Sequence, residues 1–306
     1  MNFSVVIPCR NAGPWIENTL ASVVSQSWQP AEIIVIDDGS TDDSIEKIRS
    51  FDSAIRILHS EHRNGAGTRN IGIAAATGDW IAFLDADDVW YPNHLERAAN
   101  LLSESNDVGF LNWFDHFSNE DPNARVSRPN RLDIPEPASG LTDLQFFRNY
   151  ARTHWFNMHG CVVRRDRLLE VGMLDTTQIR RHDIEMWLRV VHQHTWSYDP
   201  TPSSAYRIDT PGSISRSVAD ASYYWYVAMK KNFHCFPKKI GKQLLQHSSR
   251  ASVVNALMHG SVEEVRRAFK EPIKQLNFPM RFGLRTAQLA PPLFRYLLRI
   301  KQAVKS

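Results

Sequence analysis

The chain has 306 residues, of which 42% are hydrophobic and 23% charged, and its net charge at pH 7 is +3. This composition is typical of a soluble globular protein, excludes a disordered or fibrous chain, and gives no reason to expect a nucleic-acid partner. No apolar run approaches the roughly 18 to 20 residues that cross a bilayer. Residues 1–8 lack the basic and long apolar regions of a secretory signal.

Three cysteines, Cys9, Cys161 and Cys235, lie far apart and are odd in number. This spacing fits neither a disulfide framework nor a zinc site, so we expect a reducing, cytoplasmic location.

The first hundred residues alternate strand and helix patterns. Apolar runs predict strands, and helical spacing predicts the segments between them. Near-continuous apolar strands separated by helices indicate a mainly parallel sheet covered on both faces, and therefore an α/β fold. The expected strands are residues 3–7, 32–36, 55–58 and 81–84, and the expected helices are residues 15–25, 44–51 and 67–76.

The pattern changes after the fourth strand. Residues 121–137 predict a surface loop, residues 155–163 a strand, and residues 164–171 and 181–192 helices. Beyond about residue 223 the pattern is helical throughout. We expect one α/β domain over residues 1–220 and a helical extension over residues 221–306.

Three carboxylates, Asp85, Asp87 and Asp88, follow the fourth apolar run. Like charges this close repel one another unless something offsets them. Oxygen ligands favour Mg²⁺ or Mn²⁺. If the strand continues through the motif, Asp85 and Asp87 share one face and could hold the metal, leaving other positions to substrate phosphates. The alternative is a solvated acidic turn that caps the following helix.

Ligands of such sheets bind beyond the carboxyl ends of the strands. That rule places residues 8–11, 37–40 and 85–88 on one rim. Asp38 there could accept the imide N–H of uracil, a donor that cytosine lacks. The glycines of residues 64–70 would let a nucleotide approach the backbone, with Arg69 against phosphate or base. A plain helix-entry loop is the alternative for that segment.

Asp183 and Glu185 lie in the first turn of the helix expected over residues 181–192. Compensation of the helix dipole would explain both acids. The other interpretation makes Asp183 a general base, ionised beside Arg181 and His182 and able to take a proton from a hydroxyl.

Taken in order, these segments resemble the family 2 glycosyltransferases, inverting enzymes with the GT-A fold. The resemblance covers roughly residues 1–215 and is carried by SVVIPCRN (4–11), IVIDDGSTD (34–42), NG and RNIG (64–65 and 69–72), GDWIAFLDADD (78–88), GCVVRR (160–165) and the His-Asp pair 182–183.

The resemblance implies a role for each matching residue. Asp38 would read the base, Arg69 would support base or phosphate, Asp85 would lie near the ribose, Asp87 would ligate the metal, and Asp183 would be the catalytic base. The complete nucleotide-sugar site would be Pro8, Cys9, Arg10, Asn11, Asp38, Asn64, Gly65, Arg69, Asp85, Ala86 and Asp87, with the Mn²⁺ or Mg²⁺ on Asp87 and Asp85.

Two positions depart from the family pattern. Cys9-Arg10 replaces the usual Thr-Tyr, which puts aromatic stacking on the base in doubt, and His182 replaces the usual acidic residue before the catalytic aspartate.

The acceptor side follows from proximity to Asp183. Its candidates are Trp155, His159, Gly160, His182 and Trp187. Tryptophan is more often buried in the core, and burial is the alternative for Trp155 and Trp187. Residues 206–207 with 212–215 are similar to the family's phosphate-side loop.

The C-terminal residues 291–305 form a basic amphipathic pattern. Such a helix can lie in a membrane interface or pack on its own domain. We therefore expect a nucleotide-sugar donor, a glycan or lipid-linked acceptor and, through this tail, a peripheral place at the inner face of the cell membrane.

The resemblance implies a metal-dependent, hexosyltransferase-type enzyme that transfers a sugar from a nucleotide-diphosphate sugar, with UDP favoured by Asp38, in cell-surface polysaccharide assembly. A nucleotidyltransferase and a non-catalytic glycan- or membrane-binding module on the same fold are the alternatives.

Overall fold

The computed structural model describes residues 1–61, 64–118, 125–127, 132–153, 158–210, 218–277, 280–281 and 284–285. The chain divides into two compact units, Met1–Pro211 and Gly212–Ser306. The sequence analysis placed this boundary at residue 220.

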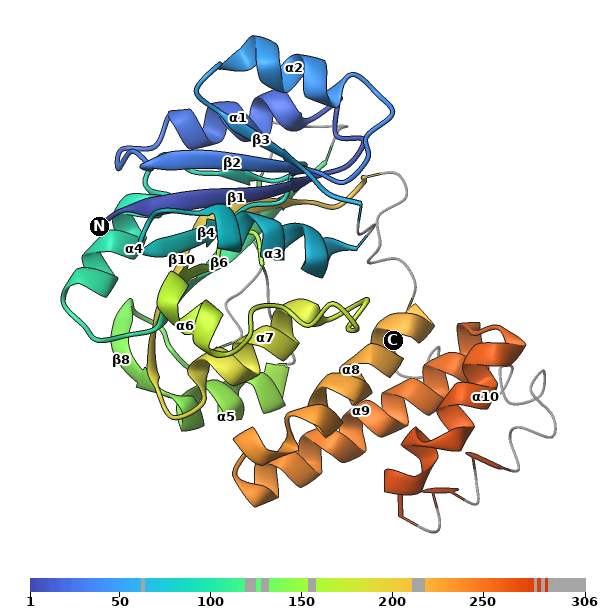
Figure 1. Ribbon diagram of the computed structural model, residues 1–306. Coiled ribbons are helices and arrows are strands. Elements are labelled where there is room, and N and C mark those ends of the chain that lie inside the picture. Colours follow the sequence, from blue (N-terminus) through green and yellow to red (C-terminus); the bar gives the residue numbers. More distant parts are fainter. Residues whose placement is uncertain are drawn as a thin grey trace. The chain divides into compact units, whose positions relative to one another are not determined.

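The first half of the sheet is parallel (Figure 1). Strands β1 (Phe3–Cys9), β2 (Glu32–Asp37), β3 (Arg56–His59) and β4 (Trp80–Phe83) lie in the order β3-β2-β1-β4. The helices between them are α1 (Ile16–Val24), α2 (Ser44–Phe51) and α3 (Gly65–Ala75). Figure 1 shows α1 and α2 on one side of this sheet and α3 on the other. The carboxyl ends of β1, β2 and β4 therefore meet at one rim, as their apolar sequences predict.

The second half of the sheet is mixed. Strand β9 (Val162–Arg164) runs antiparallel to both β4 and β6 (Gly109–Phe117), and β6 is parallel to β10 (Thr195–Arg207). The edge strands are β5 (Val89–Trp90), β7 (Val126–Ser127) and β8 (Ala138–Thr142). Of the strand expected over residues 155–163, residues 155–157 lie outside the described residues, and residues 158–161 form a turn that Cys161 closes by donating its N–H to the Met158 carbonyl at 3.1 Å. Pairing with β4 and β6 begins only at Val162.

The remaining helices of the first unit are α4 (His94–Ser103), α5 (Asp143–Thr153), α6 (Arg165–Glu170) and α7 (His182–Val191). One core lies between the sheet and the helices α1 and α4. Its members include Phe3, Val5 and Ile7 from β1 and Leu20 and Leu95 from the helices, all fully buried. Alternate positions of β1 face this core because side chains of a strand alternate between its two faces.

The acidic motif is a turn rather than a strand, which corrects the expectation of alternating faces. Strand β4 ends at Phe83, and the Asp88 N–H donates to the Asp85 carbonyl at 3.1 Å. The three carboxylates are consequently placed by a turn, and strand alternation does not govern their directions.

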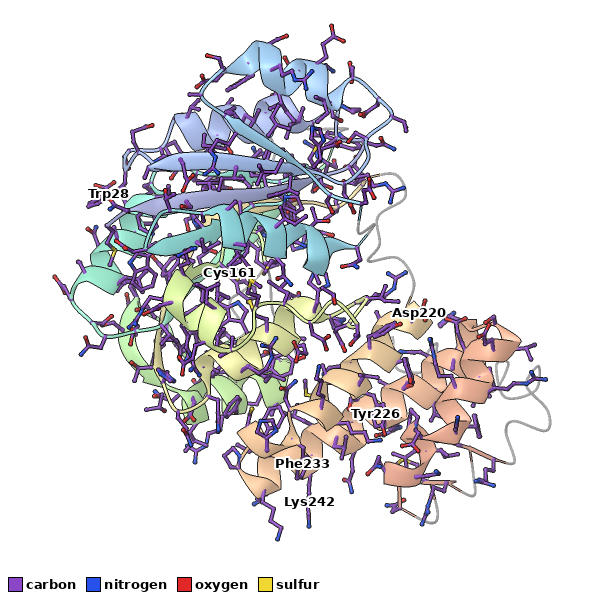
Figure 2. All side chains as sticks on the ribbon, in the orientation of Figure 1. Trp28, Cys161, Asp220, Tyr226, Phe233 and Lys242 are labelled. Atoms are coloured by element: carbon purple, nitrogen blue, oxygen red, sulfur yellow. The ribbon has the colours of Figure 1, made fainter. Side chains whose placement is uncertain are left out.

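The second unit is helical, as expected. It contains α8 (Val218–Lys231), α9 (Lys238–His259) and α10 (Val262–Lys270), with short 3₁₀ turns at Phe233–Cys235 and Pro272–Gln275. Figure 2 labels Tyr226 on α8, Phe233 in the first 3₁₀ turn and Lys242 on α9. Its apolar core includes Val253, Leu257, Ala268, Ile273 and Leu276.

A capping box begins α10. The Ser261 hydroxyl accepts the Glu264 N–H, and the Glu264 carboxylate accepts the Ser261 N–H. This reciprocal pair satisfies two backbone donors that the start of a helix leaves open.

Within the described parts of the chain, no helix is both long and apolar enough to span a bilayer. The basic tail expected over residues 291–305 lies outside the described residues.

Candidate active site

The loops after β1 and β2 are tied together by Asn11. Its side-chain oxygen accepts the Thr41 N–H at 2.8 Å, and its own N–H donates to the Ser40 hydroxyl at 3.0 Å. Asn11 adopts a left-handed backbone with φ of 50°, a conformation that asparagine tolerates better than most residues. The rim loop from β1 is thereby held against the loop that carries Asp38.

The ends of β1 and β2 also pair directly. The Cys9 carbonyl accepts the Asp38 N–H at 2.8 Å, and both side chains are buried. Burial, followed by the nearby Asp37 carboxylate, raises the pKa of the Cys9 thiol to about 12. Cys9 is therefore an uncharged, buried residue at the rim. Arg10 and Asn11 are exposed, and Pro8 is half-buried.

Arg69 joins three segments of the rim. It lies in the second turn of α3, a helix whose cap Asn64 accepts the Gly67 N–H at 2.7 Å. The Arg69 guanidinium donates to the Gly65 carbonyl at 3.0 Å and forms an ion pair with Asp85. Its Nη1 lies 3.3 Å from Nε2 of His182. Arg69 is only 6% exposed, so these contacts are made in a desolvated setting where charge-assisted hydrogen bonds are strong.

Gly65 is needed at this junction for close packing. A Cβ built on Gly65 would lie 2.7 Å from Nη1 of Arg69 and 3.4 Å from the His182 ring. Any side chain there would push the guanidinium away from its partners.

The base position lies beside this junction. Helix α7 begins after Arg181, whose φ of 60° is left-handed and uncommon for a non-glycine residue. Burial, then the positive charge of Arg69, lowers the pKa of His182. A neutral His182 can accept a hydrogen bond from Arg69. The half-buried Asp183 carboxylate makes no hydrogen bond or ion pair with any residue in the described ranges, so it is available to a substrate.

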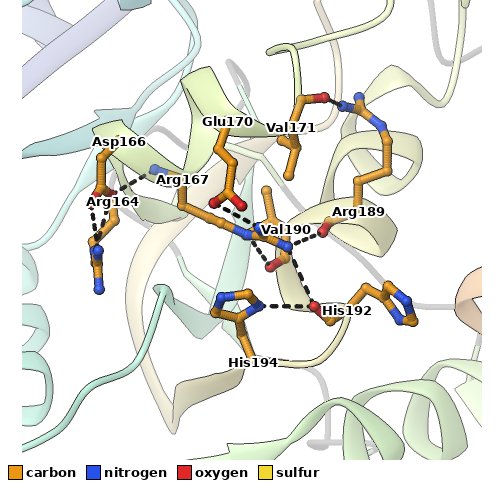
Figure 3. Close-up of polar contacts among 9 residues, drawn as sticks. All are labelled: Arg164, Asp166, Arg167, Glu170, Val171, Arg189, Val190, His192 and His194. Carbon is orange, nitrogen blue, oxygen red and sulfur yellow. Dashed lines mark hydrogen bonds and ion pairs between the residues drawn. The ribbon is translucent and has the colours of Figure 1, made fainter.

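The far end of α7 is clamped by arginines (Figure 3). The Arg167 guanidinium donates to the carbonyls of Val190 at 3.0 Å and Arg189 at 2.9 Å, which are among the last carbonyls of the helix. The Arg189 side chain in turn pairs with Glu185 at 2.6 Å and donates to the Val171 carbonyl. Because the last carbonyls of a helix lack intrahelical partners, this clamp fixes the helix that carries Asp183.

The acidic turn is held by the end of β10. The Thr210 hydroxyl donates to Oδ2 of Asp87 at 2.6 Å, and the Arg207 N–H donates to Oδ1 of Asp88 at 2.8 Å. Burial raises the pKa of Asp87, and the neighbouring Asp85 charge adds to this effect. Burial also raises the pKa of the fully buried Asp88 well above its ordinary value. Sequence reasoning missed Thr210, since nothing near residue 87 indicates a partner so far along the chain.

The oxygen ligands of the acidic turn suit a divalent cation whose remaining coordination positions are filled by substrate. Asp85 and Asp87 supply carboxylate oxygens, Ala86 between them is buried, and no group of three or more metal-ligating side chains occurs among the residues that the structure describes. Mg²⁺ is held in this way in many nucleotide enzymes, by one or two carboxylates together with phosphates and water. The raised pKa of Asp87 is consistent with a site whose repulsion a cation would relieve.

Trp187 is a core residue in this structure, which corrects its assignment to the acceptor side. Its side chain is fully buried, and its ring stacks on Phe146 with centroids 6.1 Å apart and an interplanar angle of 12°. The amphipathic helix α7 turns Trp187 inward, away from the solvent that a substrate would enter through.

His159 and Gly160 form part of a packed turn before β9. The His159 ring stacks on Tyr206 with centroids 5.4 Å apart, and burial lowers its pKa to about 4. A Cβ on Gly160 would lie 1.9 Å from Oδ1 of Asn112, so only glycine fits there. The next residue, Cys161, is fully buried as well (Figure 2). Trp155, the remaining acceptor-side candidate, lies outside the described residues.

Three comparisons show which proteins this chain resembles. A model of glycosyl transferase family 2 matches residues 4–172. Among curated proteins, the chain is 38% identical over 110 residues to an Escherichia coli UDP-Glc:alpha-D-GlcNAc-diphosphoundecaprenol beta-1,3-glucosyltransferase, WfgD, a match that covers 35% of this chain and 43% of the relative. It is 40% identical over 108 residues to the Erwinia amylovora amylovoran biosynthesis glycosyltransferase AmsB, covering 33% of this chain and 36% of that protein.

The fold also matches a solved structure. Residues 1–349 of TarS from S. aureus, in complex with UDP-GlcNAc, superpose with a TM-score of 0.71 at 17% identity, over 97% of this chain and 89% of that one. At this identity the likeness shows the fold alone, and the curated relatives are matched over less than half of their length. The family model matches residues 4–172, more than half of the chain, and the chain therefore belongs to glycosyl transferase family 2.

Proposed function

We propose that this protein transfers a sugar from a UDP-sugar to a hydroxyl of a glycan or lipid-linked acceptor, with inversion at the anomeric carbon and with Mg²⁺ or Mn²⁺. The observation that carries the proposal is the Arg69 junction. Arg69 contacts Asp85 of the acidic turn and His182, the residue before Asp183. These contacts support a site in which Asp85 would lie on the donor side and Asp183, next to His182, would act as the base.

The chemistry follows from these residues. Asp183 would remove the proton from the acceptor hydroxyl, and that oxygen would attack the anomeric carbon of the donor. The bond from that carbon to the diphosphate would break, and UDP would leave with the electron pair. A divalent ion held by Asp87 and Asp85 would neutralise the negative charge of the leaving diphosphate. Asp38, buried at the end of β2, would accept the uracil imide N–H.

The printed name of WfgD supports the donor and acceptor classes, since it specifies UDP-glucose and a diphosphoundecaprenol-linked sugar. AmsB is named as a glycosyltransferase of amylovoran biosynthesis, which supports a role in polysaccharide assembly. A lipid-linked acceptor would also be consistent with the basic sequence of residues 291–305 binding at the membrane surface.

The deciding experiment measures UDP release from a panel of UDP-sugars with wild type and Asp183→Asn, with glycan and lipid-linked acceptors. We expect turnover by wild type with Mn²⁺, a loss of about 10²–10⁴-fold in Asp183→Asn, and nucleotide affinity within a few-fold of wild type. NMR of the product should show inverted anomeric configuration. Release of pyrophosphate instead of UDP would indicate a nucleotidyltransferase, and full activity of Asp183→Asn would remove the base assignment.

A further inference from the structure

The segment Arg207–Thr210 is fastened to the acidic turn at three points. The Arg207 N–H donates to the Asp88 carboxylate at 2.8 Å, the Arg207 Nε donates to the Asp87 carbonyl at 3.0 Å, and the Thr210 hydroxyl donates to the Asp87 carboxylate at 2.6 Å. The first bond holds the Asp88 side chain, and the second holds the backbone of the turn at Asp87. Only the third reaches the carboxylate through which Asp87 would hold a cation.

The Thr210 bond distinguishes between the two carboxylate oxygens of Asp87. It engages Oδ2, and Oδ1 makes no side-chain hydrogen bond within the described part of the chain. The carboxylate also interacts with its own backbone N–H, and the Thr210 hydroxyl is the side-chain donor that limits its rotation about the last torsion, which is otherwise broad. Thr210 is itself half-buried, so water competes poorly for its hydroxyl.

Groups that orient a ligating carboxylate contribute strongly to metal affinity even though they never touch the metal. We propose that Thr210 is a positioning residue for the divalent cation, because its hydroxyl holds the Asp87 carboxylate through Oδ2 and so orients Oδ1 toward the ion. This inference rests on the metal-dependent transfer proposed above and adds to it a specific determinant of metal affinity.

The inference can be tested without an activity assay by titrating the full chain with Mn²⁺ at saturating UDP. The EPR signal of free Mn²⁺ reports how much of the ion is bound. Thr210→Val removes the hydroxyl and keeps the shape of the side chain. We expect its Kd for Mn²⁺ to rise about 10- to 100-fold, and we expect Thr210→Ser, which keeps the hydroxyl, to bind close to wild type. Thr210→Ala repeats the test if the valine variant proves unstable in thermal unfolding.

Thr177→Val is the matched control, because the Thr177 hydroxyl donates to the Asp175 carboxylate at 2.7 Å in an exposed turn outside the acidic motif. Its affinity for Mn²⁺ should equal that of wild type. If Thr210→Val binds Mn²⁺ as well as wild type, or more tightly, the positioning role is wrong while the proposed function stands. If wild type itself binds no Mn²⁺ with UDP, the metal-dependent function fails and the inference falls with it.

Discussion

Nη1 of Arg69 lies 3.3 Å from Nε2 of His182, although the two residues are 113 positions apart in the sequence. Two donors cannot share this contact, so the histidine must be neutral and accept. Arg69 therefore has one charged partner, Asp85, and one neutral partner, His182.

Arg69→Lys should lower kcat/KM for the donor roughly 10- to 100-fold, because a hydrogen bond to a charged group contributes about 1.5–3 kcal/mol. A lysine ammonium is a point charge on a flexible stem and cannot reproduce the fork that spans Gly65, Asp85 and His182. Steady-state kinetics with a UDP-sugar provide the measurement. Arg165→Lys is the control, since the Arg165 guanidinium donates to the backbone carbonyls of Ile73 and Ala74, outside this junction. An equal loss in both variants would argue against a special role for the Arg69 junction.

The acid limb of the pH–rate profile should depend on His182. Burial and Arg69 lower the pKa of His182, so the neutral form persists below the usual histidine range and is lost as the pH falls further. Protonation would place two cations side by side and release Arg69 from its position. His182→Gln can still accept from Arg69 and does not titrate, so its kcat/KM should decline at lower pH than that of wild type. Superimposable profiles would show that the acid limb does not depend on His182.

His94 should make the protein acid-sensitive. Burial lowers its pKa to about 3, and its ring stacks on Trp90 with centroids 4.5 Å apart. Because an unfolded histidine titrates near 6.5, the unfolded chain binds the extra proton first, and stability falls as the pH drops below that value. The contribution lost at pH 5 is about 2 kcal/mol. Melting temperatures at pH 7 and pH 5 should differ less for His94→Gln than for wild type, whereas the exposed His259→Gln should behave as wild type.

Gly160→Ala should destabilise the first unit by about 1–3 kcal/mol, the usual cost of overpacking. The added methyl would meet the Asn112 amide oxygen at 1.9 Å and the Ser204 hydroxyl at 2.9 Å. Chemical denaturation of Gly160→Ala, Asn112→Ala and the double variant measures this clash as a coupling energy. The double variant should be more stable than the sum of the two single effects predicts. Simple additivity would show that the methyl is accommodated elsewhere.

Local patterns were sufficient for the parallel half of the fold. The β-branched run of β1 and the helix over Ser44–Phe51 were predicted from residues adjacent in sequence, and the rim shared by β1, β2 and β4 follows from the rule for parallel strands. The mixed half was harder because β9 has only three residues and depends on pairing with β4 and β6.

The sequence could locate candidate site residues where the residue type indicates a chemistry. Carboxylates after an apolar strand predict a cation site at the acidic turn, and an aspartate in the first turn of α7 predicts a base; both roles stay predictions. The sequence near each residue indicated neither the contact of Thr210 with Asp87 nor the burial of Trp187. The first depends on a contact between positions 123 apart, and the second depends on which face of α7 the core covers.

The three cysteines have a practical consequence. Cys9, Cys161 and Cys235 are all buried, and burial raises the pKa of the first two thiols. Because the thiolate is the reactive form, the native protein should resist maleimide and spin-label reagents. New cysteines placed at exposed positions, for example Lys242→Cys on α9 and Arg49→Cys on α2, would then be the fast-reacting thiols. A doubly labelled protein could report the distance between the two units in solution, with and without UDP, without removal of any natural cysteine.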